Sequence, residues 1–150
     1  MERINVLICA GTGCTSSNSP AIEAEFERWI AQFGLEKEVK IVKTGCFGLC
    51  QKGPIVAIHP DRVFYCQVKP EDVHEIVSEH LYKGRRVERL EMHDIDEETK
   101  DKIFNIDKIR FYAKQQRIAL RNCGVINPED IMEYIARDGY MALGKVLTEM

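Results

Sequence analysis

Hydrophobic and polar residues follow strand-like and helix-like patterns in turn along the first part of the chain. The apolar run from Ile4 to Cys9 predicts a buried strand, and the alternating segment from Val39 to Val42 predicts a second one. Between them, Ser19 and Pro20 form a typical helix start, and Gly34 a typical helix end. Apolar residues recur on one face of this helix, namely Ile22, Phe26, Trp29, Ile30 and Phe33. The pattern predicts a strand, a helix and a second strand.

The next forty residues continue this alternation. Residues 54–58 and 63–68 read as two strands joined by the turn 59–62, which contains a proline and an aspartate. A second helix begins at Pro70 and ends near Gly84. Its apolar face consists of Val73, Ile76, Val77 and Leu81. The predicted order is β-α-β-β-α, and the predicted fold class is therefore α/β.

The remainder of the chain has a different character. Residues 85–101 are rich in acidic side chains and predict an exposed connector or a solvated helix face. Residues 127–130 begin a short predicted helix that ends at Gly139, and a last helix runs from Tyr140 to Met150. Tyr140, Leu143, Val146 and Leu147 lie along one side of this last helix. We expect a domain at 1–84, a charged linker at 85–103 and a partly helical segment at 104–150.

Length, composition and charge narrow the class of protein. The chain has 150 residues, of which 45% are hydrophobic and 30% charged, which suits one globular domain with a dependent extension. Its net charge of −3 argues against a general nucleic-acid binder. No apolar run approaches the length of a membrane span, and an acid at Glu2 does not fit a signal peptide. We therefore expect a cytoplasmic protein.

Six cysteines carry the chemistry that the sequence suggests. In a reducing compartment, clustered cysteines point to metal or redox work and not to disulfides. Four of them form two close pairs, Cys9 with Cys14 and Cys46 with Cys50. Each pair follows one of the two strands that a single helix joins. Such strands are parallel and end at the same edge of the sheet, so both pairs are expected at one place.

Four thiolates at one point are the ligand set of a [2Fe-2S] cluster, with two thiolates on each iron. The glycine-rich loops around the pairs bring backbone N–H groups close to the sulfur atoms, and few acidic residues lie there. Three alternatives stay open. Zinc knuckles use tighter C-x2-C pairs, a thiol redox enzyme uses C-x-x-C, and unliganded structural cysteines rarely lie in glycine-rich loops. Cys66 and Cys123 fall outside the set.

The histidines and the basic residues give weaker evidence of a function than the cysteines do. The four histidines are scattered, and we expect His74, His80 and His93 to serve packing or the surface. His59, on a predicted turn, is the one histidine that merits a test as a ligand. A basic stretch made of Lys108, Arg110, Lys114, Arg117 and Arg121 is expected to be a solvated face.

Two motifs resemble a known family. Residues 9–17 (CAGTGCTSS) and 44–54 (TGCFGLCQKGP) are similar to the thioredoxin-like [2Fe-2S] ferredoxin domain. That domain occurs alone, in the 24-kDa-type subunit of NADH dehydrogenase, and in the flavoprotein subunit of NAD(P)-dependent, electron-bifurcating hydrogenases. Residues 112–124 (YAKQQRIALRNCG), 127–135 (NPEDIMEYI) and 139–143 (GYMAL) look like the start of the FMN- and NADH-binding region of that flavoprotein subunit.

This resemblance implies a thioredoxin-like domain followed by a mostly helical C-terminal extension. It implies that Cys9, Cys14, Cys46 and Cys50 hold the cluster and that Pro54 follows a cis peptide bond. The expected function is one-electron transfer as the N-terminal module of an NAD(P)H-linked oxidoreductase. The expected partners are other subunits of that oxidoreductase or a redox protein, and a homodimer is left open. The alternative is a zinc-stabilised docking module.

The resemblance also limits what this chain does alone. The family's Gly- and Arg-rich FMN loop, NADH-binding fold and further iron–sulfur motif do not occur here, so the chain looks like the N-terminal portion of such a subunit. FMN, NADH and further clusters are expected only in the remainder of the parent subunit. We expect no catalysis by this chain alone.

Overall fold

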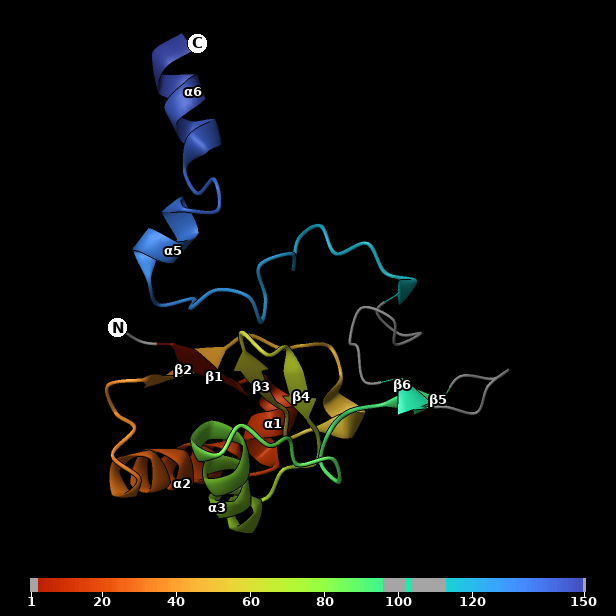
Figure 1. Ribbon diagram of the computed structural model, residues 1–150. Helices are drawn as coiled ribbons and strands as arrows, with labels where there is room; N and C mark the ends of the chain where they lie inside the picture. Colours follow the sequence, from red (N-terminus) through yellow and green to blue (C-terminus); the bar gives the residue numbers. More distant parts are fainter. Residues whose placement is uncertain (1–2, 96–101, 104–112, 150) are drawn as a thin grey trace.

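The fold is known from a computed structural model that describes residues 3–95, 102–103 and 113–149. A four-stranded sheet forms its centre, in the order β2-β1-β3-β4 (Figure 1). β1 and β2 are parallel, whereas β3 runs antiparallel to both β1 and β4. The strands are β1 (Ile4–Cys9), β2 (Val39–Thr44), β3 (Val56–His59) and β4 (Val63–Tyr65).

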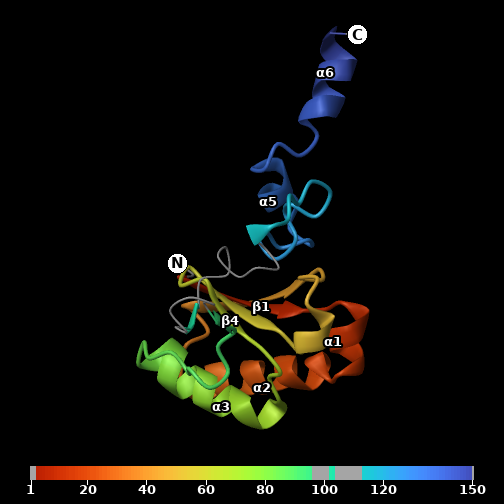
Figure 2. The same cartoon turned by 90° about the vertical axis from the view of Figure 1, so that its right-hand side faces the viewer.

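Helices cover one face of this sheet, where α2 and α3 lie side by side in both views (Figures 1 and 2). A short helix, α1 (Thr12–Ser16), follows β1 and precedes α2 (Ser19–Gln32). The second helical region has three parts: a 3-10 turn η2 (Pro70–Asp72), α3 (Val73–Glu75) and a π-helical stretch η3 (Ile76–Tyr82). The predicted β-α-β-β-α order and the α/β class are confirmed.

Successive side chains along each strand point to opposite faces of the sheet, and apolar side chains form one cluster on each face. Toward the helices, Val6, Ile8 and Ile58 pack with the buried side of α2, which consists of Ile22, Phe26 and Ile30. Trp29 and Phe33 are partly buried against the same cluster, so the predicted helix face is confirmed. On the opposite face, Leu7 and Ala57 pack with Phe47, Leu49 and Met92. The loop after β2 therefore covers the second face.

The expectation that the charged segment after Gly84 is exposed is wrong for its first part. Val87, Leu90 and Met92 are buried. The backbone extends the sheet beyond β4, because Cys66 N donates to Leu90 O at 2.9 Å and Met92 N donates to Phe64 O at 2.7 Å. Three apolar residues among many charges are enough to bury part of this segment, and Glu91 between Leu90 and Met92 is buried as well. Residues 96–101 of the expected linker lie outside the described residues.

The C-terminal part contains the predicted helices. β5 (Asp94–Ile95) pairs with β6 (Lys102–Ile103), and later come α5 (Ile131–Ile135) and α6 (Met141–Glu149). The Asp130 carboxylate caps α5 by accepting from Met132 N and Glu133 N. Both helices lie on the side of the sheet away from α2 and α3 (Figures 1 and 2). No helix among the described residues is long and apolar enough to span a bilayer.

A buried hydrogen-bond chain fixes the segment after η3 to the core. Tyr65, with no exposed surface, accepts from Val87 N at 3.1 Å, and its hydroxyl lies 2.8 Å from His80 Nδ1. His80 Nε2 lies 3.1 Å from an Asp61 carboxylate oxygen. Burial raises the pKa of Tyr65 to about 12 and lowers the pKa of His80, although Asp61 opposes the second shift. Tyr65 and His80 therefore satisfy each other's buried polar atoms inside the core.

We expect Tyr65→Phe to lower the free energy of unfolding by about 2 kcal/mol, because it leaves the buried Val87 N–H and His80 Nδ1 without this partner. Urea unfolding measures the change. Tyr82→Phe is the matched control, since that side chain is 60% exposed and should change the free energy of unfolding little. Equal effects of the two substitutions would show that the buried hydroxyl contributes nothing specific.

Candidate metal centre

Two cysteine-bearing loops meet at the edge where the parallel strands β1 and β2 end. Cys9, the last residue of β1, is in register with Thr44, the last residue of β2. Ala10 N donates to Thr44 O at 2.9 Å, which joins the two loops directly after the strands. Cys9 N donates to Ile55 O at 3.1 Å, so the start of β3 lies at the same edge. The parallel arrangement that the sequence predicted is confirmed.

The first cysteine pair is buried. Cys9 and Cys14 are each only 1% exposed. Their side chains are hydrogen-bonded, because α1 turns Cys14 back toward the end of β1. Burial, and then the hydrogen bond to Cys9, raises the pKa of Cys14 to about 12.

The second pair lies toward solvent. Cys46 Sγ and Cys50 Sγ are 3.7 Å apart, and Gly48 N donates to Cys46 Sγ at 3.3 Å. Cys50 begins the 3-10 turn η1 (Cys50–Lys52) and is exposed, whereas Cys46 is half-buried. The hydrogen bond to Cys46 raises the pKa of Cys50. The backbone N–H of Gly48 is the kind of donor that stabilises negative charge on a thiolate.

Close packing at two glycines shows how near the pairs lie to each other. A side chain at Gly11 would place its Cβ 3.2 Å from Cys46 Sγ. A side chain at Gly53 would place its Cβ 2.8 Å from Cys14 Sγ and 3.3 Å from Cys50 O. The peptide bond between Gly53 and Pro54 is cis, as the resemblance implied. Glycine therefore lets both loops close around the sulfur atoms.

The four cysteines are arranged in two pairs, and a single metal ion and a two-iron cluster place different demands on such pairs. A tetrahedral zinc ion with four sulfur ligands needs every pair of sulfurs about 3.8 Å apart. Cys46 and Cys50 meet this distance, yet no group of three or more His, Cys, Asp or Glu side chains in the described part of the chain is arranged to hold one ion. Two sulfur pairs on adjoining loops would fit a two-iron cluster, which takes two thiolates on each iron.

Comparison with known proteins identifies the family. The profile of the thioredoxin-like [2Fe-2S] ferredoxin family matches residues 1–81, more than half of the chain. The chain belongs to this family. A 2Fe-2S ferredoxin of Clostridium pasteurianum is 42% identical over 79 residues, which cover 53% of this chain and 78% of that protein. Its membership makes the chain a ferredoxin-type electron carrier, and its cofactor is a [2Fe-2S] cluster.

Solved structures agree with this membership. The crystal structure of the thioredoxin-like [2Fe-2S] ferredoxin from Aquifex aeolicus superimposes with a TM-score of 0.58 at 36% identity. The match covers 63% of this chain and all of that one. The ferredoxin fold of the Aquifex protein thus accounts for the first part of this chain.

A third relative is much longer than this chain. The NADP-reducing hydrogenase subunit HndC of Solidesulfovibrio fructosivorans is 66% identical over 35 residues. The match covers 23% of this chain and only 7% of that subunit. It shows a short shared segment and leaves the rest of the subunit unmatched.

The other candidate residues of this ferredoxin, which are histidines and the two remaining cysteines, do not belong to the two cysteine pairs. His59 pairs with Asn5, at the opposite end of β1 from Cys9, and is therefore not placed to be a ligand. His80 serves packing, as expected. Cys66 is half-buried beside the second apolar cluster, and burial raises its pKa to about 11. Cys123 lies against Gly45, a placement that no spacing pattern predicted.

Proposed function

We propose that Cys9, Cys14, Cys46 and Cys50 hold the [2Fe-2S] cluster of this ferredoxin and that the chain passes single electrons through it. The observation that carries the proposal is the meeting of two cysteine-bearing loops at one sheet edge, where Ala10 N bonds Thr44 O. When bound, such a cluster accepts and releases one electron at a time. All that the protein does here is bind the cluster, shield it and orient donors toward it.

The four side chains have different tasks in this proposal. Cys9 and Cys14, which are almost fully buried, would hold the cluster on its inner side. Cys50 is exposed and would hold the cluster near the surface, which is where a partner protein can approach. The Gly48 N–H, 3.3 Å from Cys46 Sγ, offsets charge on that thiolate. The side of the second pair would therefore be the side that a redox partner meets.

A zinc-stabilised docking module is the second candidate. The 3.7 Å separation of Cys46 and Cys50 suits a zinc ion as well as it suits an iron. Membership of a ferredoxin family favours iron, since the whole matched region, residues 1–81, belongs to [2Fe-2S] ferredoxins. The two candidates differ in one measurable property, because only the iron cluster is coloured and redox-active.

We further propose that this chain acts as the N-terminal module of an NAD(P)H-linked oxidoreductase of several subunits, of the flavoprotein (diaphorase or hydrogenase β) type. The short match to a hydrogenase subunit supports this placement. In this view residues 1–84 are the ferredoxin domain, 85–103 the linker and 104–150 the start of the FMN- and NADH-binding region. Residues 104–112 of that region lie outside the described residues.

A diaphorase assay tests the module proposal. We expect no NADH–ferricyanide turnover by this chain alone, because a one-electron centre cannot accept a hydride and the flavin site is expected elsewhere in the parent. Dithionite should still reduce the cluster, and this reduction serves as the positive control. Turnover that scales with the concentration of this chain, after removal of trace flavoproteins, would contradict the proposal.

A further inference from the structure

A short turn in the C-terminal segment packs directly on the loop that carries Cys46. Gly124 N donates to Thr44 Oγ1 at 3.0 Å in a buried position, although 80 residues separate the two in sequence. A side chain at Gly124 would meet the Phe47 ring at 2.1 Å, and one at Gly45 would meet Cys123 Sγ at 2.6 Å. The turn therefore contacts the residues on both sides of Cys46.

Thr44 joins three parts of the protein. Its carbonyl oxygen accepts from Ala10 N, next to Cys9, and its hydroxyl accepts from Gly124 N. The residue is 2% exposed, so an unpaired Gly124 N–H at this place would be costly. Phe47 is held from its other side by Phe64, with ring centroids 5.3 Å apart. Thr44 and Phe47 thus connect the turn to the loop that carries Cys46.

The turn is closed by an arginine from the basic stretch. The Arg117 guanidinium donates to Leu120 O at 2.9 Å and to Cys123 O at 2.8 Å, and Cys123 N donates to Leu120 O at 3.1 Å. Arg117 is therefore part of a local structure, contrary to the expected solvated face. Gly124 adopts a φ of +75°, which glycine tolerates best.

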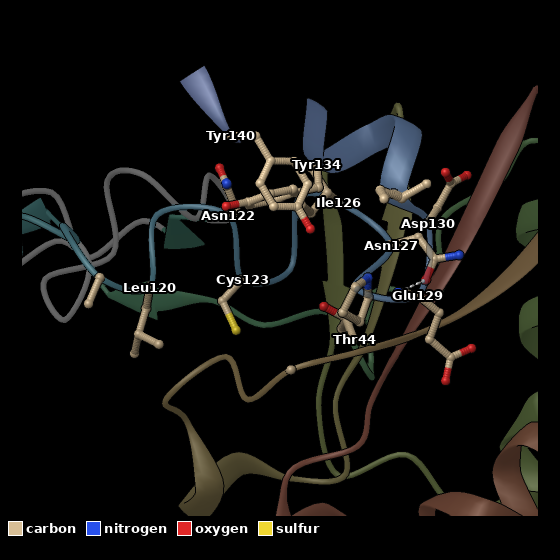
Figure 3. Close-up of a pocket in the computed structure, with 14 residues that line it drawn as sticks. Thr44, Leu120, Asn122, Cys123, Ile126, Asn127, Glu129, Asp130, Tyr134 and Tyr140 are labelled. Carbon is tan, nitrogen blue, oxygen red and sulfur yellow. Dashed lines mark hydrogen bonds between the residues drawn. The ribbon is translucent and has the colours of Figure 1, made fainter. Parts of the chain in front are cut away.

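Around this contact the C-terminal segment stands away from the domain. A cavity of about 530 Å³ lies beside it, lined by Thr44, Cys123, Ile126 and Tyr134 among others. Figure 3 shows the Cys123 side chain pointing toward the loop that follows Thr44, while Tyr134 and Tyr140 border the cavity farther out. The hydrogen bond from Gly124 N to Thr44 Oγ1 is one of the contacts that hold the turn on the domain.

We propose that residues 117–124 form a clasp that closes over the Cys46 loop, and that Thr44 and Gly124 are positioning residues for the cluster. This inference rests on the proposed ligand set. The closed clasp covers the half-buried side of Cys46 and leaves the Cys50 side open. It fixes the ligand loop and keeps water and chelators from the iron that Cys46 binds.

The test compares matched variants of the full chain carrying its cluster. Thr44→Val removes the acceptor of Gly124 N, whereas Thr44→Ser keeps it. Gly124→Ala drives a methyl into Phe47, whereas Gly34→Ala has a similar φ of +69° with no atom within 4 Å. Hydrogen exchange of residues 122–126 reports whether the clasp is closed, and the rate of bleaching by an iron chelator reports protection of the cluster.

We expect Thr44→Val to raise both the exchange of residues 122–126 and the bleaching rate about tenfold, the factor that one net hydrogen bond is worth. Gly124→Ala should raise both at least as much, because its methyl does not fit against the Phe47 ring. Thr44→Ser and Gly34→Ala should behave like the wild type. Arg117→Gln, which loses the paired guanidinium bonds to Leu120 O and Cys123 O, supplies a second opening variant should Thr44→Val not fold. Unchanged exchange would show that no clasp closes, and raised exchange with unchanged bleaching would show that the clasp does not guard the cluster.

These outcomes are separable from failure of the ligand set itself. Hydrogen exchange at residues 122–126 is measured on the polypeptide and needs no assumption about which cysteines bind iron. If Cys46→Ser keeps the full visible spectrum, the ligand set is wrong whatever the clasp does.

Discussion

Replacing Cys14 or Cys50 by serine is expected to abolish the visible absorbance of the purified protein. In the proposed ligand set, each substitution removes one of the four thiolates of the cluster, and serine is a poor ligand for iron in this setting. Cys14 is 1% exposed and sits inside the domain, so water cannot replace its sulfur. Absorption spectra of anaerobically purified variants, with iron content per chain, measure the loss.

Cys66→Ser and Cys123→Ser are the matched controls for this experiment. Both residues are half-buried cysteines, and neither belongs to the two pairs at the sheet edge. We expect these variants to keep a full spectrum. Circular dichroism checks that all four variants fold. Bleaching in Cys66→Ser together with a normal spectrum in Cys14→Ser would contradict the ligand set.

Gly53→Ala is expected to lower cluster occupancy by more than half. The added methyl would lie 2.8 Å from Cys14 Sγ, closer than side-chain carbons normally come to any atom. A free cysteine would rotate away, but a cysteine bound to iron cannot do so and remain a ligand. Iron per chain and the absorbance ratio of cluster to protein give the occupancy.

Gly144→Ala is the control for the change of residue type. Gly144 lies in α6, and nothing stands within 4 Å of an added Cβ there. Alanine also favours a helix, so this variant should fold and carry its cluster like the wild type. Full occupancy in Gly53→Ala would mean that Cys14 Sγ is free to move and does not bind iron.

The fold and the meeting of the cysteine pairs were predictable because they depend on local pattern and one topological rule. An apolar run, a helix with one buried face and a second strand give two parallel strands. Cys9 and Thr44, aligned at the ends of those strands, bring both loops together whatever the length of the connection. The ligand set proposed from spacing needed no knowledge of side-chain packing.

Two features escaped this reasoning because they depend on contacts distant in sequence. Val87 and Leu90 are buried among charged neighbours, and composition alone does not reveal such isolated buried positions. The hydrogen bond from Gly124 to Thr44 has no periodic signal at all. A glycine beside a cysteine at 123–124 indicates a turn but not the surface on which the turn packs.

Analysis of iron, acid-labile sulfide and zinc, combined with EPR of the dithionite-reduced protein, tests the central claim most directly. We predict two irons and two sulfides per chain with negligible zinc, because the four cysteines of two adjoining loops suffice for one [2Fe-2S] cluster. The oxidised protein should be EPR-silent, and reduction should produce the signal of one unpaired electron per chain. One zinc per chain, with negligible sulfide and no such signal, would contradict the account.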